Sequence, residues 1–410
     1  MPEDTPARLK TGWYLLGPAF VAAIAYVDPG NVAANISAGA QFGFALLWVI
    51  VLANVMAGLV QYLSAKLGLV TGRSLPEAIG GKLSRPARLA FWIQAEIVAM
   101  ATDVAEVIGG AIALHILFRL PLMLGGVITG VVSLLLLRIQ DQRGQQIFER
   151  VITGLLLLIA IGFTASFFVA TPPPGDVVGG LVPRFLGKES VLLAAAILGA
   201  TVMPHAVYLH SGLARDRHGH PDPGPERRRL LRVTRLDVGL AMVVAGAVNA
   251  AMLLVAALNM QGRGGSGSIE GAYAAVHDTV SPLIAVFFAV GLLASGLASA
   301  SVGAYAGAMI MQGLLYRSIP MVLRRLATLT PALLILALGF NPTRTLVLSQ
   351  VVLSFGIPFA LLPLVRLTGN RALMGVDVNH RVTTAIGWVI GTLISLLNVV
   401  LIYLTVTGTK

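Results

Sequence analysis

The segment Asp28-Pro29-Gly30-Asn31 constrains the fold most, because it lies within an apolar stretch, 14–40, that is otherwise long enough to cross a membrane. A charge at mid-membrane costs about 2.5–3.5 kcal/mol on insertion scales, so an aspartate there needs a reason. Proline and glycine break the helix and free backbone carbonyls, which persist at that depth only inside protein or along a watery cavity. A carboxylate, an amide and free carbonyls together indicate an oxygen-rich cation site and transport of a cation.

Composition indicates a membrane protein. Of the 410 residues, 56% are hydrophobic and only 11% are charged, whereas soluble proteins carry about 25% charged residues. We therefore expect an all-α integral membrane protein that forms a single transmembrane transporter domain over residues 1–410 and crosses the membrane eleven times. The predicted spans are 14–40, 43–69, 89–117, 121–139, 147–170, 190–213, 236–260, 280–311, 320–339, 345–366 and 382–406.

The net charge of +11 is distributed as in a membrane protein and gives no reason to expect a nucleic-acid partner. When the loops are read alternately from a cytoplasmic N-terminus, most of the 29 lysines and arginines fall on the inner side. This positive-inside bias predicts a multi-pass protein of the cell inner (plasma) membrane with its N-terminus in the cytoplasm. An odd number of spans then places the C-terminus outside the cell.

A second break occurs at Met203-Pro204-His205, inside the sixth predicted span. Five spans separate the two breaks, so the second half of the chain would enter the membrane with opposite polarity. Paired interrupted helices at corresponding positions indicate an inverted-repeat transporter whose site lies between the breaks. The first repeat is predicted at about 14–170 and the second at about 190–366, followed by an extra helix at about 382–406.

The residues at the breaks have two interpretations. Asp28 and Asn31 could bind a metal with an unwound carbonyl near Ala25, or Asp28 could only cap the second half-helix. Met203 could be a soft ligand, or it could fill a gap in the packing as membrane methionines often do. Cysteine is absent, so any soft ligand must be methionine or histidine. A thioether among oxygens favours Mn²⁺ or Fe²⁺ over Ca²⁺ and Mg²⁺.

Three acids share one face of the third span. Offsets of seven and ten residues place Glu96, Asp103 and Glu106 within an arc of about 80°. Acids on one face of a membrane helix indicate a hydrated path or a proton relay, in which Asp103 is the best acceptor. The alternative is ion pairing, with Arg324 and Arg325 as candidate partners, and the two interpretations are compatible.

Three further polar side chains lie in apolar runs. His205 and His210 follow the second break and could handle protons or gate the path, since imidazole titrates near neutral pH. Each could instead be a neutral, hydrogen-bonded histidine. Gln350 could supply an oxygen ligand or form an interhelical hydrogen bond.

The chain resembles the natural resistance-associated macrophage protein (Nramp) family of divalent-metal transporters, of the bacterial proton-coupled manganese type. The segments that carry the resemblance are Ala25–Asn31, Met100–Glu106 and Gly199–His205. It implies a LeuT-type fold of eleven spans, in a 5+5 inverted repeat with broken helices 1 and 6. The implied metal ligands are Asp28, Asn31, Met203, the Ala25 and Ala200 carbonyls and, in some states, Gln350.

The resemblance also implies a proton route and a substrate class. The route comprises Asp103, Glu106, Glu96, Arg324 and Arg325, with His205 and His210 linked to pH dependence and gating. The implied activity is proton-coupled uptake of Mn²⁺, and also Fe²⁺, by alternating access. The partners are then divalent ions, protons and the lipid bilayer, with no cofactor, no enzymatic activity and no obligate protein partner.

Two rival functions stay open. One is a sodium-coupled organic solute symporter of the same fold. The other is an intramembrane metalloenzyme that would use His205, His210 and Asp28.

Overall fold

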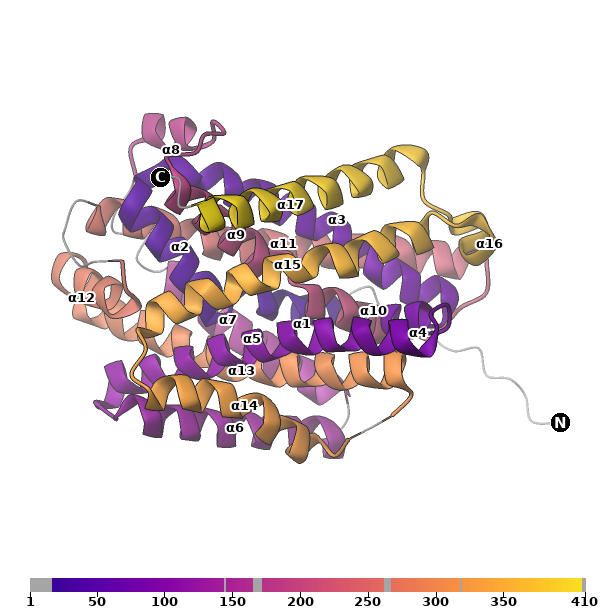
Figure 1. The fold of residues 1–410 in the computed structure, drawn as a ribbon, viewed down its shortest axis with the longest axis horizontal. Coiled ribbons are helices and arrows are strands. Elements are labelled where there is room, and N and C mark those ends of the chain that lie inside the picture. The colour runs from indigo at the N-terminus through magenta and orange to yellow at the C-terminus, as the bar shows by residue number, and fades with distance from the viewer. Residues whose placement is uncertain (1–16, 144, 165–171, 262–266, 318, 408–410) are drawn as a thin grey trace.

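The regular structure of the chain is helical throughout the described part. The structure, a computed structural model, describes residues 17–143, 145–164, 172–261, 267–317 and 319–407. The long helices lie side by side, with α8 and α12 at one end of the bundle and α4 and α16 at the other (Figure 1). The elements are α1 (Pro18–Ile24), η2 (Ala25–Val27), α2 (Pro29–Phe42), η3 (Gly43–Leu46), α3 (Leu47–Thr71), α4 (Leu75–Gly80), α5 (Arg85–Phe118), α6 (Leu122–Arg143), α7 (Gln145–Thr164), α8 (Pro174–Gly180), α9 (Lys188–Thr201), α10 (Pro204–His218), α11 (Pro225–Met260), α12 (Ile269–Thr279), α13 (Pro282–Leu315), α14 (Met321–Ala337), α15 (Pro342–Thr368), α16 (Arg371–Met374), η5 (Gly375–Asp377) and α17 (Arg381–Thr407).

Several of these helices suit a bilayer. By length and composition, seven helical stretches in the described residues could cross a membrane, and the first of them, Pro29–Thr71, joins α2 and α3 through η3. Shorter apolar helices occur at Pro18–Val27, Leu122–Leu136 and Arg150–Thr164. The seven stretches are Pro29–Thr71, Arg85–Phe118, Lys188–His218, Pro225–Met260, Pro282–Leu315, Pro342–Thr368 and Arg381–Leu404.

The helix bounds depart from the predicted spans most clearly at α11. The predicted spans 190–213 and 236–260 leave a connecting segment between them, but α10 continues to His218 and α11 already begins at Pro225. Proline at the first helical position is pre-organised for a helix, and the arginines that follow are good helix formers, so the polar residues extend the helix beyond the apolar run. The predicted limits at 14–16 and 165–170 lie outside the described residues.

Both predicted breaks are present in the backbone. The helix α1 passes through the 3₁₀ turn η2 into Asp28, which is extended at ψ 166°, and α2 then begins with proline. At the second break α9 ends at Thr201, and Met203 leaves the helical region at ψ 121° before the proline that begins α10. Each second half-helix therefore starts with a proline, which lacks the N–H that a helix start leaves unpaired.

The helices α3 and α10 are in backbone contact beyond the second break. A Cβ on Gly68 of α3 would collide with the carbonyl oxygen of Ser211 on α10. Ser64 Oγ donates to the Val207 carbonyl at 2.5 Å, and Leu75 N at the start of α4 donates to Ser211 Oγ at 2.8 Å. Only glycine allows this approach, so α3, α4 and α10 form one tightly packed unit.

Candidate functional site

Hydrogen bonds from Asn31 join the two breaks. Asn31 Nδ2 donates to the Ala200 carbonyl at 2.7 Å and to Asp28 Oδ1 at 3.1 Å. On its other side, Asn31 Oδ1 accepts from Thr201 Oγ1 at 3.5 Å. The side chains of Asp28 and Asn31 are fully buried, as is Ala200. One amide therefore links the last turn of α9 to the first turn of α2, far from bulk solvent.

The two oxygens of Asp28 have different surroundings. Oδ1 accepts from Asn31 N at 2.8 Å, so Asp28 is the N-cap of α2, as the structural interpretation of this residue predicted. Among the described residues, Oδ2 accepts only one long hydrogen bond, from Gln350 Nε2 at 3.5 Å. Gln350 Nε2 also donates to Ser349 Oγ at 3.2 Å, while its Oε1 is buried with no hydrogen-bond partner in the described part of the chain. A weakly engaged carboxylate oxygen and a free amide oxygen therefore lie near each other.

The Gln350 side chain occupies space that only glycine leaves open. A Cβ on Gly30 would overlap the Gln350 amide. The glycine of the first break thus has a packing role besides its effect on the helix, because it admits an amide from α15 beside Asp28.

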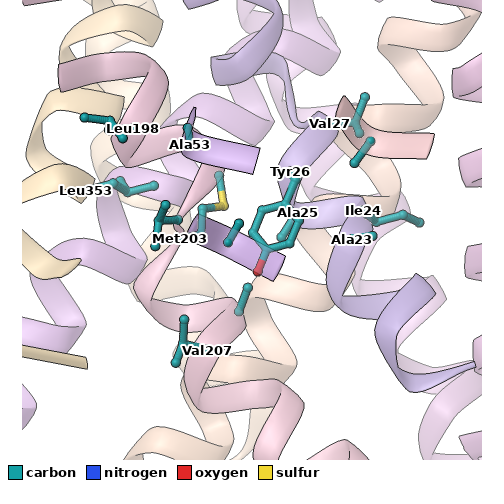
Figure 2. Packing of buried hydrophobic residues seen from close by; sticks show 14 of the residues in the cluster. Ala23, Ile24, Ala25, Tyr26, Val27, Ala53, Leu198, Met203, Val207 and Leu353 are labelled. Carbon is teal, nitrogen blue, oxygen red and sulfur yellow. The ribbon is translucent and has the colours of Figure 1, made fainter. Parts of the chain in front are cut away.

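Met203 and Ala25 belong to the same buried cluster and are both fully buried. Figure 2 shows Met203, Tyr26 and Ala25 among the same buried side chains, with Val207 further along α10. The soft thioether therefore lies in the region where the two breaks meet. No group of three or more histidines, aspartates and glutamates in the described residues could hold a metal. A metal bound here would depend on the mixed set of carboxylate, amide, thioether and carbonyl groups.

Two side chains that were not predicted as site residues hold the first break open. Asn249 Nδ2 on α11 donates to the Tyr26 carbonyl at 2.9 Å, while its Oδ1 accepts from Asn35 Nδ2 at 2.9 Å. Ser295 Oγ on α13 donates to the Val27 carbonyl at 2.5 Å. The Tyr26 and Val27 carbonyls at the break are thereby satisfied, as buried backbone requires. Asn249 is visible in the sequence as an amide within an apolar run, whereas Ser295 looks like any small residue of a packed membrane helix.

Two of the three predicted acids on α5 form ion pairs with α14. Arg324 Nη2 lies 3.0 Å from Glu96 Oε1, and Arg325 Nη1 pairs with Asp103 Oδ1. Arg325 also donates to Ser133 Oγ from Nε at 3.2 Å and from Nη2 at 3.0 Å. The proposed partners are therefore the observed ones, and the relay candidate Asp103 already holds a buried guanidinium.

The third acid, Glu106, differs from the other two. Its Oε1 accepts from Ser299 Oγ at 2.7 Å, and its buried Oε2 has no hydrogen-bond partner among the described residues. His205 and His210 also have one ring nitrogen each, Nε2, without a hydrogen-bond partner among the described residues. His205 Nδ1 lies 3.4 Å from Thr102 Oγ1, and His210 Nδ1 lies 2.6 Å from Gln61 Oε1. His205 and His210 follow the second break on α10, and Glu106 lies on α5.

A pocket of about 500 Å³ lies between α2, α9 and α15, the helices that carry Asn31, Ala200 and Gln350. It is at the end of the bundle where α12 lies. The lining residues are Ser37, Gln41, Glu189, Leu192, Leu193, Gly267, Ser268, Asn341, Thr343, Arg344, Val347 and Leu348.

Ion pairs join neighbouring elements at the opposite end of the bundle. Arg215 Nη1 lies 2.5 Å from Glu77 Oε2 and ties α10 to α4. Arg227 Nε lies 3.1 Å from Asp377 Oδ2 and ties α11 to η5. The pocket thus lies at the end with α12, and we call the end with α4 and α16, where these ion pairs lie, the sealed end.

Known proteins are similar to this chain in sequence and in fold. The family described as natural resistance-associated macrophage protein-like matches residues 19–404. The divalent metal cation transporter MntH of Mycobacterium tuberculosis is 80% identical over 408 residues, which cover 100% of this chain and 95% of that protein. The crystal structure of the Eremococcus coleocola manganese transporter matches with a TM-score of 0.85 at 32% identity, over 98% of this chain and 88% of that one. The structure of MhsT in complex with L-phenylalanine is 16% identical, with a TM-score of 0.57 over 99% of both chains, and shares the fold alone.

Proposed function

The chain belongs to the natural resistance-associated macrophage protein family, and on this premise we propose that it carries Mn²⁺, and also Fe²⁺, into the cytoplasm together with protons. The relatives are named as divalent metal cation transporters, which makes this multi-pass membrane protein a transporter and not an enzyme. The observation that carries the proposal is the 2.7 Å hydrogen bond from Asn31 to the Ala200 carbonyl, because it joins the two helix breaks.

The metal would replace hydrogen bonds that now hold the breaks together. Asn31 would turn its oxygen toward the ion, and the Ala200 carbonyl would exchange the Asn31 amide for the metal. Asp28 would contribute Oδ2 without losing its cap, and Gln350 would contribute its free Oε1 in some states. Met203 and the Ala25 carbonyl would complete the shell. A thioether in this set disfavours Ca²⁺ and Mg²⁺, which prefer all-oxygen ligands.

Protons would leave along the acids of α5. Asp103 would accept a proton when its contact with Arg325 loosens, and Glu106 and Glu96 would continue the path. Arg324 would hold Glu96 in place, while His205 and His210 would make the path sensitive to pH. The pairing of Asp103 and Arg325 supports this role, because a buried pair changes its energy strongly when one partner is neutralised.

We propose eleven spans, in two inverted repeats of five at about 14–170 and 190–366 with an extra helix at about 382–406. This is the LeuT-type arrangement, and the position of the two breaks supports it. The chain would lie in the inner membrane with its N-terminus in the cytoplasm, which places the 500 Å³ pocket on the outer side. A divalent ion moving inward gains about 2.3 kcal/mol per charge for each 100 mV of inside-negative potential.

Proteoliposomes test the function directly. Purified protein should carry Mn²⁺ down an imposed membrane potential and acidify the interior, and Asp103→Asn should suppress acidification more than metal uptake. The matched control is Asp176→Asn, an acid on the short helix α8 far along the chain from α5. Equal proton movement in parent and Asp103→Asn would remove the relay role. Uptake of a labelled amino acid in place of Mn²⁺ would support an organic solute symporter instead.

A further inference from the structure

The sealed end of α11 carries a row of arginines that the transport site does not use. Arg228, Arg229, Arg232 and Arg235 lie within two turns and are all exposed. At about 100° per residue they occupy an arc of about 120° on the helix. In the described part of the chain, no ion pair is formed by the first three. Unneutralised arginines so close together repel one another, so they favour an anionic partner.

The fourth arginine marks one edge of this face. The guanidinium carbon of Arg235 lies 5.0 Å from the centre of the Tyr62 ring on α3, and Nη2 donates to the Tyr62 hydroxyl at 3.3 Å. This contact holds Arg235 against the neighbouring helix. The neighbouring acids of α11 do not lie on the face that the arginines occupy. Asp237 is buried, and helical spacing places Glu226 about 60° outside the arc of the arginines.

An exposed apolar stripe continues the same face along α11. Leu236 is 58% exposed, Leu240 is 42% exposed and Val243 is 68% exposed, and Ala247 is exposed beyond them. Helical spacing places all four within about 40° of Arg229. At about 1.5 Å per residue the stripe is about 17 Å long, which is close to half of a hydrocarbon core of about 30 Å. A stripe of this length spans one leaflet.

We propose that this face of α11 binds an anionic phospholipid of the leaflet at the sealed end, which is the inner leaflet in the orientation given above. The phosphate contacts Arg228, Arg229 and Arg232, and an acyl chain lies along Leu236 and Val243. Charge complementarity identifies the headgroup as anionic, and the leaflet-length apolar stripe below it identifies a lipid. Basic clusters beside membrane helices attract anionic headgroups in this way.

The test is a lipid titration of the purified full chain followed by native mass spectrometry, with dioleoyl phosphatidylglycerol and dioleoyl phosphatidylcholine as probes. The triple variant R228Q/R229Q/R232Q should bind phosphatidylglycerol about 100-fold more weakly, at about fivefold per arginine, with phosphatidylcholine binding unchanged. The matched control is R366Q/R371Q/R381Q, which removes three exposed arginines from other segments and lowers the net charge equally. We expect the control to stay within about threefold of the parent.

A charge-preserving variant separates the lipid site from misfolding. R228K/R229K/R232K should retain the preference for phosphatidylglycerol, and all variants should carry Mn²⁺ like the parent in phosphatidylcholine vesicles. Three outcomes would overturn the proposal. They are an unchanged phosphatidylglycerol affinity in the glutamine triple, equal losses in the two glutamine triples, and displacement of the lipid by excess inorganic phosphate. None of them bears on metal transport, so the two proposals fail separately.

Discussion

Replacing Asp28 with asparagine separates the two roles that one carboxylate could have at the first break. Asparagine has nearly the same shape and caps helices as well as aspartate, so the hydrogen bond from Asn31 N at 2.8 Å should remain. The thermal stability of the metal-free protein should then stay close to that of the parent. The charge, however, is lost, so a role in metal binding should be lost with it.

The expected loss of affinity is large. Two unit charges 4 Å apart attract by about 4 kcal/mol at an effective dielectric constant of 20, so a divalent ion and one carboxylate attract by about 8 kcal/mol. Part of this attraction offsets the cost of removing water from the ion and the carboxylate, so only the remainder contributes to affinity. We therefore expect Asp28→Asn to lose at least about 3 kcal/mol of binding free energy, or more than 100-fold in Kd. Asp28→Ala should show the same loss of affinity and, in addition, lose about 1 kcal/mol of stability with the cap.

Isothermal titration of Mn²⁺ into purified parent, Asp28→Asn and Asp28→Ala measures the affinity, and thermal unfolding of the metal-free proteins measures the cap. The reasoning fails if Asp28→Asn binds Mn²⁺ within threefold of the parent. It fails equally if Asp28→Asn unfolds as early as Asp28→Ala, because the carboxylate would then matter to the fold alone.

Three other substitutions test the selectivity of the site, its buried ion pair and the close packing of its helices. Met203→Ala should admit Ca²⁺ while keeping part of the Mn²⁺ uptake, and Ca²⁺ exclusion equal to the parent's in competition uptake would rule out a thioether filter. Arg325→Met should leave the Asp103 carboxylate buried without its partner and cost about 3–5 kcal/mol, measured by denaturant unfolding, and adding Asp103→Asn should recover most of it. Gly199→Ala would press a Cβ against a backbone carbonyl of α15 and should lower the free energy of unfolding by about 1–3 kcal/mol. The control Gly154→Ala, with no atom within 4 Å of the added Cβ, should be neutral or stabilising. Equal effects of the two substitutions would contradict the close approach of α9 and α15.

The breaks could be predicted from sequence because their cost is local. An aspartate, a proline and a glycine in an apolar stretch contradict a continuous membrane helix whatever surrounds them. The same holds for Met203-Pro204, where a proline interrupts a second apolar run. The metal-binding roles of these residues remain predictions, since they depend on an ion that the chain alone does not reveal.

Other features depend on how distant helices pack and leave little trace in the sequence. Arg324 and Arg325 were both candidate partners for the acids of α5, but the rotation of α14 against α5 decides which arginine meets Glu96 and which meets Asp103. Ser295 supports the first break from α13, 268 positions away along the chain. A serine in a helix rich in small residues gives no local signal of such a contact.

The glycine contact between α3 and α10 determines how the sealed end can open. With the Ser211 carbonyl against Gly68 and Ser64 bonded to the Val207 carbonyl, neither helix can slide or tilt without the other. A swing of α10 must carry α3 and α4 as a single rigid body. We therefore expect the hinge at Val202 and Met203, where the backbone is already non-helical, so the proposed metal ligand Met203 would also be the residue about which this end of the bundle turns.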